Sequence, residues 1–269
     1  MKDENDPRFA TTLARGLSVL RAFRMGEDGL SNAEIAQRTG LPKSTVSRLT
    51  WTLVRLGYLV QSSNDDRFRP GPTLIAVGQV AGSSLSFLVP AHDLMSELAD
   101  ATGTLVVLSV RDGDKLVLIR TWRPRGVSSI WLEVGQRIPM RRTASARAYV
   151  AALSSAEFEQ LLSARDFSGA DELHGWAEER NQALAELAAK GFVRTAGGAQ
   201  SGVAYNAVSA PFRPGELAEP VTFTCGALPD TADLERIDTQ IGPMLSEAVR
   251  RLERMTGQMS SLIRKDIRP

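Results

Sequence analysis

The chain has 269 residues, which predicts about two domains, and its 43% hydrophobic and 23% charged content excludes wholesale disorder. The net charge of +1 conceals an asymmetry, because residues 8–58 hold eight basic and three acidic side chains while residues 71–269 hold 21 basic and 23 acidic ones. A basic segment on a near-neutral body favours an anionic partner for that segment, with nucleic acid as the first candidate.

The N-terminal part reads as three helices. The first is predicted over residues 12–25. The second spans about 32–39, since Ser31 and Glu34 have capping-box spacing and Gly40 suits the left-handed position after a helix. The third covers about 42–56. The apolar residues expected to face the core are Leu13, Leu17 and Leu20 in the first helix and Val46, Leu49, Leu53 and Leu56 in the third.

A small β-hairpin follows the third helix. Strands at 58–60 and 67–69 are joined by a polar turn, which puts Arg67 and Arg69 on one face. Three helices and a two-stranded wing make a winged helix-turn-helix domain, which we place at residues 9–70.

Residues 71–89 are predicted to form a linker whose helix, 73–89, is largely apolar. Its exposed face would suit packing against another subunit, or docking on the chain's own second domain. Both alternatives stay open.

Residues 90–257 are predicted to form the second domain, and residues 258–269 a C-terminal tail. The strands are expected at 104–111, 115–122, 127–134, 192–196, 204–210 and 221–226. The helices are expected at 92–101, 143–153, after Ser154, at 176–190 up to Gly191, and from 234 to 252 with a kink at Pro243. Strands and helices do not alternate as βαβ units, so the sequence predicts an antiparallel α+β fold.

The strongest functional pattern is the third helix. A helix that enters the major groove presents short hydrogen-bonding groups near its N-terminus and Arg or Lys for bases and phosphates. The candidate DNA contacts here are Lys43, Ser44, Thr45, Ser47 and Arg48. Arg67 and Arg69 are candidates for phosphate or minor-groove contacts.

Other patterns are weaker. Seven arginines stand between residues 120 and 147 beside one acid, Glu133, and guanidinium groups suit an acidic small molecule. The glycine-rich stretch 197–202 lies between two predicted strands without a helix after it, so we expect a loop. Cys225 is expected to be a small residue of the core or of a pocket wall.

Catalytic and targeting signals are missing from the sequence. It contains no GxGxxG, GxxxxGK[ST], GxSxG or HExxH pattern. One cysteine and two histidines, His92 and His174, do not have metal-ligand spacing, so neither a metal nor another cofactor is expected. No apolar run reaches the roughly 18 residues of a membrane span, and the N-terminus does not read as a secretory signal. We therefore expect a cytoplasmic protein with no membrane partner.

Several blocks of the sequence resemble the IclR family of bacterial transcriptional regulators. They are residues 13–17, 30–36, 40–49, 56–59 and 67–71, and more loosely 135–148 and 202–211. The resemblance implies a winged-helix head, a linker helix that dimerises, and a GAF-like effector-binding body assembled as a dimer or a dimer of dimers. By motif position it implies DNA contacts from Arg15, Ser31, Lys43, Thr45 and Arg48.

The same resemblance implies an effector site in the second domain. Ala144 and Ser145 match the loop that binds the effector's polar group, and Val127, Ile130 and Ile138 match apolar pocket positions. The further candidates for this site are Met140, Tyr205, Asn206, Phe223 and Cys225. Ala146 and Arg147 replace the family's usual Gly-Lys, which favours a larger or aromatic ligand over a small oxo acid.

The sequence therefore predicts a repressor whose operator binding responds to a small, acidic or aromatic metabolite. Two other classes of protein remain as alternatives. One is an enzyme with an accessory DNA-binding head, and the other is an architectural DNA-binding protein whose body is filled and binds no ligand.

Overall fold

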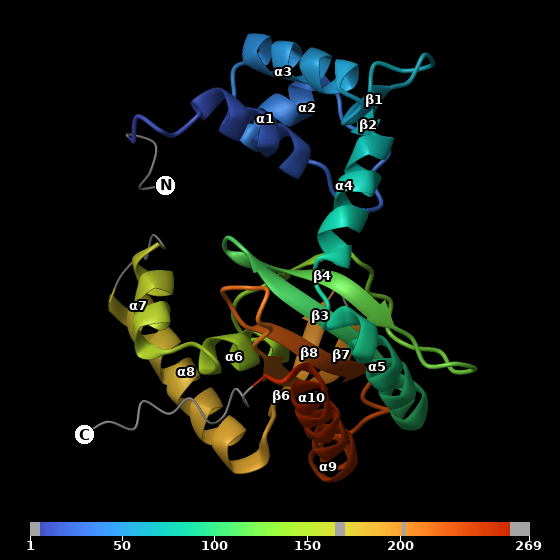
Figure 1. Ribbon diagram of the computed structural model, residues 1–269, viewed down its shortest axis with the longest axis vertical. Helices are drawn as coiled ribbons and strands as arrows, with labels where there is room; N and C mark the ends of the chain where they lie inside the picture. The colour runs from blue at the N-terminus through green and yellow to red at the C-terminus, as the bar shows by residue number, and fades with distance from the viewer. Residues whose placement is uncertain (1–5, 165–169, 201–202, 259–269) are drawn as a thin grey trace. The chain divides into compact units, whose positions relative to one another are not determined.

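The computed structural model describes residues 6–164, 170–200 and 203–258 (Figure 1). The chain divides into two compact units, Met1–Leu85 and Ser86–Pro269. The boundary falls inside the predicted linker, and the linker helix belongs to the first unit.

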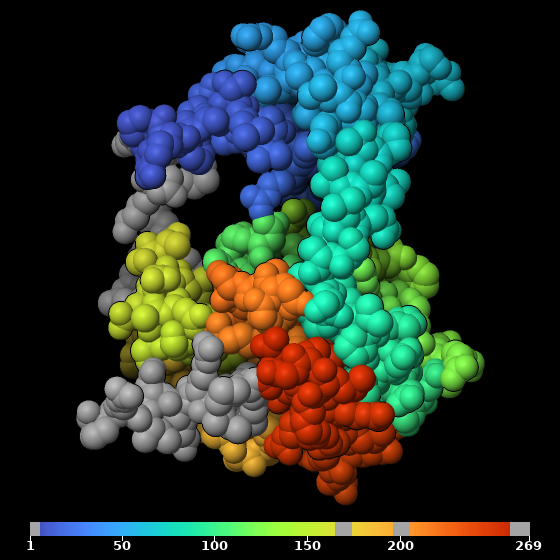
Figure 2. All heavy atoms as spheres, in the orientation of Figure 1, coloured from blue at the N-terminus to red at the C-terminus, as the bar shows by residue number. Residues whose placement is uncertain are grey.

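The first unit is a winged helix-turn-helix, as predicted. Its elements are α1 (Thr11–Arg21), α2 (Asn32–Thr39), α3 (Lys43–Arg55), β1 (Leu59–Gln61), β2 (Phe68–Pro70) and α4 (Pro72–Ser83). The strands are antiparallel, with Val60 opposite Arg69, and Leu30 adds a bridge to Phe68. The turn between β1 and β2 projects from this unit (Figure 2).

Helix α2 begins and ends where its sequence signals predict. Ser31 accepts a hydrogen bond from the Glu34 amide, and the Glu34 carboxylate accepts one from the Ser31 amide. Gly40 follows the helix with φ of 69°, in the left-handed region that glycine occupies without strain. These contacts satisfy amide groups that the helix itself leaves unpaired.

The core of the first unit differs in part from the prediction. Val46 belongs to the buried cluster of this unit, and Leu20, Leu49 and Leu53 pack against that cluster. By contrast, Leu13, Leu17 and Leu56 are 62%, 51% and 59% exposed. In α1 the one buried residue is Val19. The regular leucine spacing therefore did not identify the buried face of α1.

The predicted linker helix is shorter than expected. Helix α4 ends at Ser83, and α5 (Leu88–Thr102) begins a separate helix in the second unit. The hydroxyls of Ser83 and Ser84 donate to backbone carbonyls within α4, while the Ser86 amide donates to the Glu216 carboxylate at 2.9 Å. Side-chain hydrogen bonds of this kind compete with helix continuation.

The second unit is built on a six-stranded antiparallel sheet with the order β5-β4-β3-β8-β7-β6. The strands are β3 (Leu105–Asp112), β4 (Lys115–Trp122), β5 (Arg137–Pro139), β6 (Val193–Gln200), β7 (Val203–Phe212) and β8 (Val221–Ala227). This confirms the predicted α+β class.

Helices cover both faces of this sheet (Figure 1). On one face lie α6 (Ala144–Ala151) and α7 (Ser155–Ser163), with α8 (Ala170–Lys190) beside α6. On the other lie α5 and α10 (Gly242–Thr256), over a row of aromatic rings in which Phe212 and Phe223 have centroids 6.1 Å apart. Successive strand residues point to opposite faces, so residue parity decides which side of the sheet a side chain reaches.

Two sheet predictions were wrong. Residues 127–134 form no strand, and the third strand of the hairpin region is β5 instead. Gly197 to Gln200 belongs to β6, with a register shift between Thr195 and Gly198, whereas a loop was expected. Residues 201–202, also part of that predicted loop, lie outside the described residues.

The C-terminal helix is interrupted as Pro243 predicts. A short helix, α9 (Leu234–Arg236), leads into a π-helical turn (Ile237–Ile241), and α10 starts directly before the proline. Proline has no amide hydrogen to continue an α-helical ladder, which accounts for the altered turn. The predicted apolar stripe is buried from Ile237 to Leu252, while Leu234 is 36% exposed. Helix α8 starts six residues earlier than predicted.

Among the described residues, no single helix is long and apolar enough to cross a membrane. Helices α4 and α5 reach that length and composition only together, but they are separate helices and α5 buries seven residues in its own unit.

Candidate functional site

The exposed surface of α3 is polar and basic. Lys43, Ser44, Ser47 and Arg48 are exposed and Thr45 is half-buried. The helix contains no acidic residue, and among the described residues neither Lys43 nor Arg48 pairs with an acid. A helix with this surface can approach a phosphate backbone without losing an internal ion pair.

Helix α3 is held firmly by α2. The buried hydroxyl of Thr50 lies 3.0 Å from both the side-chain oxygen of Asn32 and the carbonyl of Val46. On the outer side, the Arg55 guanidinium lies 5.2 Å from the centre of the exposed Trp51 ring. Sequence reasoning missed Thr50, because a hydroxyl near the middle of a helix does not reveal its partner.

The two wing arginines are engaged within their own unit. Arg67 donates to the Glu34 carboxylate at 3.0 Å and to backbone carbonyls of the segment before α2. Arg69 donates to Asp28 and Asp65, each at 2.8 Å. Their charges are therefore partly neutralised. Their guanidinium groups attach the β1–β2 wing to the rest of the first unit.

The other two predicted DNA contacts occupy different settings. Arg15 is exposed on α1. Ser31 is half-buried, and its hydroxyl donates to the Glu34 carboxylate at 2.7 Å within the capping box.

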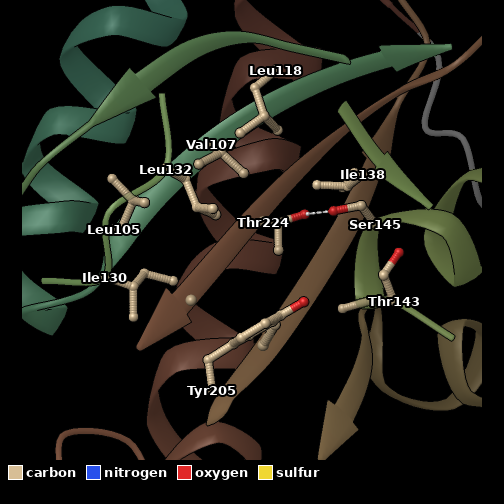
Figure 3. A pocket seen from close by; sticks show the side chains of 13 residues that line it. Leu105, Val107, Leu118, Ile130, Leu132, Ile138, Thr143, Ser145, Tyr205 and Thr224 are labelled. Atoms are coloured by element: carbon tan, nitrogen blue, oxygen red, sulfur yellow. Dashed lines mark hydrogen bonds between the residues drawn. The ribbon is translucent and has the colours of Figure 1, made fainter. Parts of the chain in front are cut away.

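The second unit contains a small cavity of about 30 Å³ between the sheet and the N-terminus of α6 (Figure 3). This volume is enough for about two water molecules. The wall is made of apolar and hydroxyl-bearing residues: Leu105, Val107, Leu118, Ile130, Leu132, Ile138, Thr143, Ala144, Ser145, Tyr205, Ala207, Thr224 and Gly226. Among the described residues, no acidic, basic or imidazole side chain lines the cavity.

A line of buried hydroxyls runs from the cavity into the sheet. The oxygens of Ser145 and Thr224 are 2.7 Å apart, and this contact faces the cavity in Figure 3. Thr224 donates to Ser209 at 2.8 Å, and Ser209 donates to the Phe223 carbonyl at 3.0 Å. Ser145, Thr224 and Ser209 thus form a connected hydrogen-bond network on the polar side of the cavity. The hydroxyl protons of this network are used in hydrogen bonds within it.

The structure brings five of the ten predicted effector residues to this cavity, namely Ile130, Ile138, Ala144, Ser145 and Tyr205. Ile130 and Leu132 enter from the segment after β4, across from Thr143 and Ser145 (Figure 3). Burial raises the pKa of the Tyr205 phenol.

The other five predicted effector residues do not line the cavity. Asn206, Phe223 and Cys225 alternate with lining residues along β7 and β8, so they point to the α5 and α10 face. Met140 packs in the core and Val127 is 54% exposed. The prediction included consecutive residues of β7 and β8, whereas only every second residue of a strand faces the cavity.

Eight lining residues were missed by sequence reasoning. Thr224 and Gly226 could have been found from the alternation in β8, because they flank Cys225. Leu105, Val107 and Leu118 carry no local signal, since any buried strand shows the same residue types.

The seven arginines between residues 120 and 147 do not converge. None lines the cavity. Four pair with acids elsewhere in the unit: Arg125 with Asp100, Arg137 with Asp112, Arg141 with Glu179 and Arg147 with Glu186. The structure does not assemble the anionic-ligand site that the cluster suggested.

The thiol and the imidazoles are likewise placed away from the cavity wall. Cys225 is buried, and burial raises the pKa of its thiol to about 12. His92 accepts a hydrogen bond from Trp122 at 3.1 Å, and His174 is exposed. Within the described residues, no three His, Cys, Asp or Glu side chains are grouped closely enough to hold a metal ion.

Two family models match the chain. The IclR helix-turn-helix domain matches residues 12–63, and the bacterial transcriptional regulator IclR C-terminal model matches residues 81–171. The chain is 29% identical to the HTH-type transcriptional regulator TsaQ1/TsaQ2 of Comamonas testosteroni over 93% of its length and 90% of that protein.

Solved structures agree with these matches. An IclR family transcriptional regulator from Brucella abortus is 30% identical, with a TM-score of 0.79 over 94% of this chain and 95% of that one. An IclR homolog from Microbacterium hydrocarbonoxydans, complexed with 4-hydroxybenzoate, shares the fold at 19% identity, with a TM-score of 0.68 over 93% and 98% of the two chains. Together with the winged helix and the basic α3, these matches place the chain in the IclR family of DNA-binding transcriptional regulators.

Proposed function

We propose that α3 lies in the major groove of an operator and that the chain acts as a repressor in the bacterial cytoplasm. The observation that carries this proposal is the exposed, acid-free surface of α3, with Lys43, Arg48 and three short hydroxyl-bearing residues in its first two turns. Short side chains allow close approach to base edges, and the two cations reach guanine or phosphate. Arg15 adds a phosphate contact from α1.

In this proposal Ser31, Arg67 and Arg69 rank below α3. The ion pairs of both arginines with Asp28, Glu34 and Asp65 compete with phosphate. The main role of Arg67 and Arg69 is to hold the wing in place. Ser31 contributes chiefly as the cap of α2, the helix that supports α3.

The second unit, in this proposal, binds a small and mainly apolar metabolite at the cavity between the sheet and α6. The lining of hydroxyl and hydrocarbon groups supports this, as does a relative that is complexed with 4-hydroxybenzoate. If the metabolite and the operator favour different arrangements of the chain, each weakens the other by the same coupling free energy, typically about 1–3 kcal/mol.

A homo-oligomer completes the proposal. Helix α4 has no buried residue, and Ile75, Val77 and Val80 are 69%, 50% and 71% exposed. Figure 2 shows its visible face uncovered by the rest of the first unit. Pairing through α4 would let two heads read half-sites about 34–36 Å apart, or a multiple of this spacing. A dimer or a dimer of dimers satisfies this geometry.

We favour binding over catalysis at the cavity. In the part of its wall that the structure describes, there are hydroxyls but no carboxylate, imidazole or amine to act as a general base. The architectural alternative requires a filled body, and a cavity bordered by Ala144, Ser145 and β8 disfavours it.

The decisive experiment compares the chain's upstream intergenic DNA with a scrambled duplex by fluorescence anisotropy, at a fixed salt concentration of about 0.15 M. We expect a clear preference for the native DNA. Arg48→Ala should abolish this preference while leaving the circular dichroism spectrum unchanged. The matched control is Arg24→Ala, an exposed arginine outside α3, which should bind like the wild type. Retained preference in Arg48→Ala would contradict the assignment of α3.

A further inference from the structure

The protons of the cavity hydroxyls point away from the cavity. The Ser209 hydroxyl donates to the carbonyl of Phe223, which can only accept. Since each hydroxyl has one proton, Thr224 must be the donor to Ser209, and Ser145 must in turn be the donor to Thr224. The direction of the whole line is therefore set by the backbone carbonyl at its far end.

Thr143 is committed in the same way. Its hydroxyl donates to the Pro139 carbonyl at 3.3 Å and accepts from the Ala146 amide at 3.1 Å as the cap of α6. Ser145, Thr224 and Thr143 thus present only oxygen lone pairs to a bound molecule. The remaining wall hydroxyl, that of Tyr205, makes no hydrogen bond within the described residues and can still donate.

We infer that this cavity selects an uncharged ring compound that donates a hydrogen bond, such as a phenol, over a carboxylate. A phenolic hydroxyl can donate to Ser145 and accept from Tyr205 at the same time. The inference rests on the proposed effector site and specifies the chemistry of the ligand.

A carboxylate fits this wall poorly. It has no proton to give to the acceptor oxygens, and the described lining residues include no cationic side chain to balance its charge. The donors that could serve it are the amide groups in the first turn of α6 and the Tyr205 hydroxyl, so benzoate is included in the test as the competing ligand.

The apolar lining fits a ring, provided that the wall opens. A cavity of about 150 Å³ holds benzene, roughly five times the present volume. Ile130 and Leu132 belong to a segment without regular secondary structure, and this side of the wall can give way without breaking the sheet.

The test compares three single-ring probes on the full chain at pH 7 by ligand-detected NMR titration. Phenol has the donor, anisole has the same ring with the hydroxyl methylated, and benzoate has the charge. We expect phenol to bind roughly threefold to tenfold more tightly than anisole, the worth of one hydrogen bond, and more tightly than benzoate. Equal binding of phenol and anisole, tighter binding of benzoate, or no binding of phenol would each overturn the inference.

A matched pair of variants checks the site. Ser145→Ala should weaken phenol binding by roughly threefold to tenfold and leave anisole unchanged. Ser109→Ala also removes a buried hydroxyl of the same sheet, paired with Thr222 at 2.9 Å but outside the cavity wall, and should change neither probe. Equal effects of the two variants on phenol would contradict the assignment of Ser145.

Binding of the upstream DNA, measured on the same preparation, distinguishes failure of the ligand inference from failure of the proposed function. Intact DNA preference without phenol selectivity would remove the ligand class alone. Loss of DNA preference in the wild type would instead remove the proposed function.

Discussion

The guanidinium of Arg123 lies 4.4 Å from the centre of the Trp131 ring and also donates to the carbonyls on either side of that residue, Ile130 at 3.1 Å and Leu132 at 2.6 Å. One side chain at the end of β4 therefore holds three consecutive residues of the following segment. Trp131 is 74% exposed, while Ile130 and Leu132 line the cavity. Arg123 fixes the wall of the candidate effector site from outside.

Replacing Arg123 by glutamine should loosen residues 129–134. Glutamine has no positive charge to interact with the Trp131 ring, and it cannot donate to the carbonyls of Ile130 and Leu132 as the guanidinium does. Local opening of the segment therefore becomes easier. We expect amide exchange in this segment to rise by roughly tenfold or more, measured by hydrogen–deuterium exchange mass spectrometry on the full chain.

The control for this change is Arg125→Gln. Arg125 lies in the same segment and is 89% exposed at its side chain, but it pairs with Asp100 instead of the carbonyls of residues 130 and 132. It should leave exchange at residues 129–134 within about twofold of the wild type. Equal acceleration by both variants would mean that Arg123 does not hold the wall.

This segment also shows where sequence reasoning stops. Residues 127–134 were predicted to form a strand, and their sequence contains no signal for the Arg123 contacts that hold them in an irregular path. Such contacts depend on the fold as a whole. Ile130 was nevertheless identified as a pocket residue through the family resemblance, without knowledge of its backbone.

Local signals performed better where the chemistry is local. The capping box at Ser31 and the left-handed conformation of Gly40 were predicted because each satisfies backbone groups within a few residues. Ser154 and Gly191 likewise stand at the start of one helix and the end of another, as expected. Side-chain direction was predicted less well. Phe223 lies on the correct strand and the wrong face. Val221, Phe223 and Cys225 alternate with Thr222 and Thr224, but every residue of β8 is buried, so the alternation alone does not say which face borders the cavity.

The winged-helix head should lose stability in acid through Glu34. Hydrogen bonds from the Ser31 amide and hydroxyl and from Arg67 lower the pKa of this carboxyl from 4.5 to about 2. Because the folded pKa is lower than the unfolded one, the contribution of Glu34 is complete above pH 4.5. It declines as the pH falls toward 2 and is absent below that.

Glu34→Gln measures this contribution. Glutamine keeps the capping geometry but has no charge to lose, so the variant should be less stable than the wild type at pH 6 and equal to it near pH 2. Urea unfolding of the full chain, followed by circular dichroism at several pH values, gives both curves. Gln37→Ala, which changes an exposed uncharged side chain of α2, should keep a constant difference from the wild type. A gap between wild type and Glu34→Gln that persists at pH 2 would contradict the assignment.

The proposed assembly through α4 is tested by placing a charge on its apolar face. Val80→Glu would put a carboxylate with no partner into the proposed interface, where an uncompensated charge is strongly unfavourable. We expect the dissociation constant of the dimer to rise by roughly 100-fold, equal to about 2.8 kcal/mol, as measured by sedimentation velocity over a range of protein concentrations. Gln79→Glu adds the same charge at the neighbouring exposed position of the helix and should leave the constant within about threefold of the wild type. If Val80→Glu instead assembles like the wild type, α4 does not form the subunit contact.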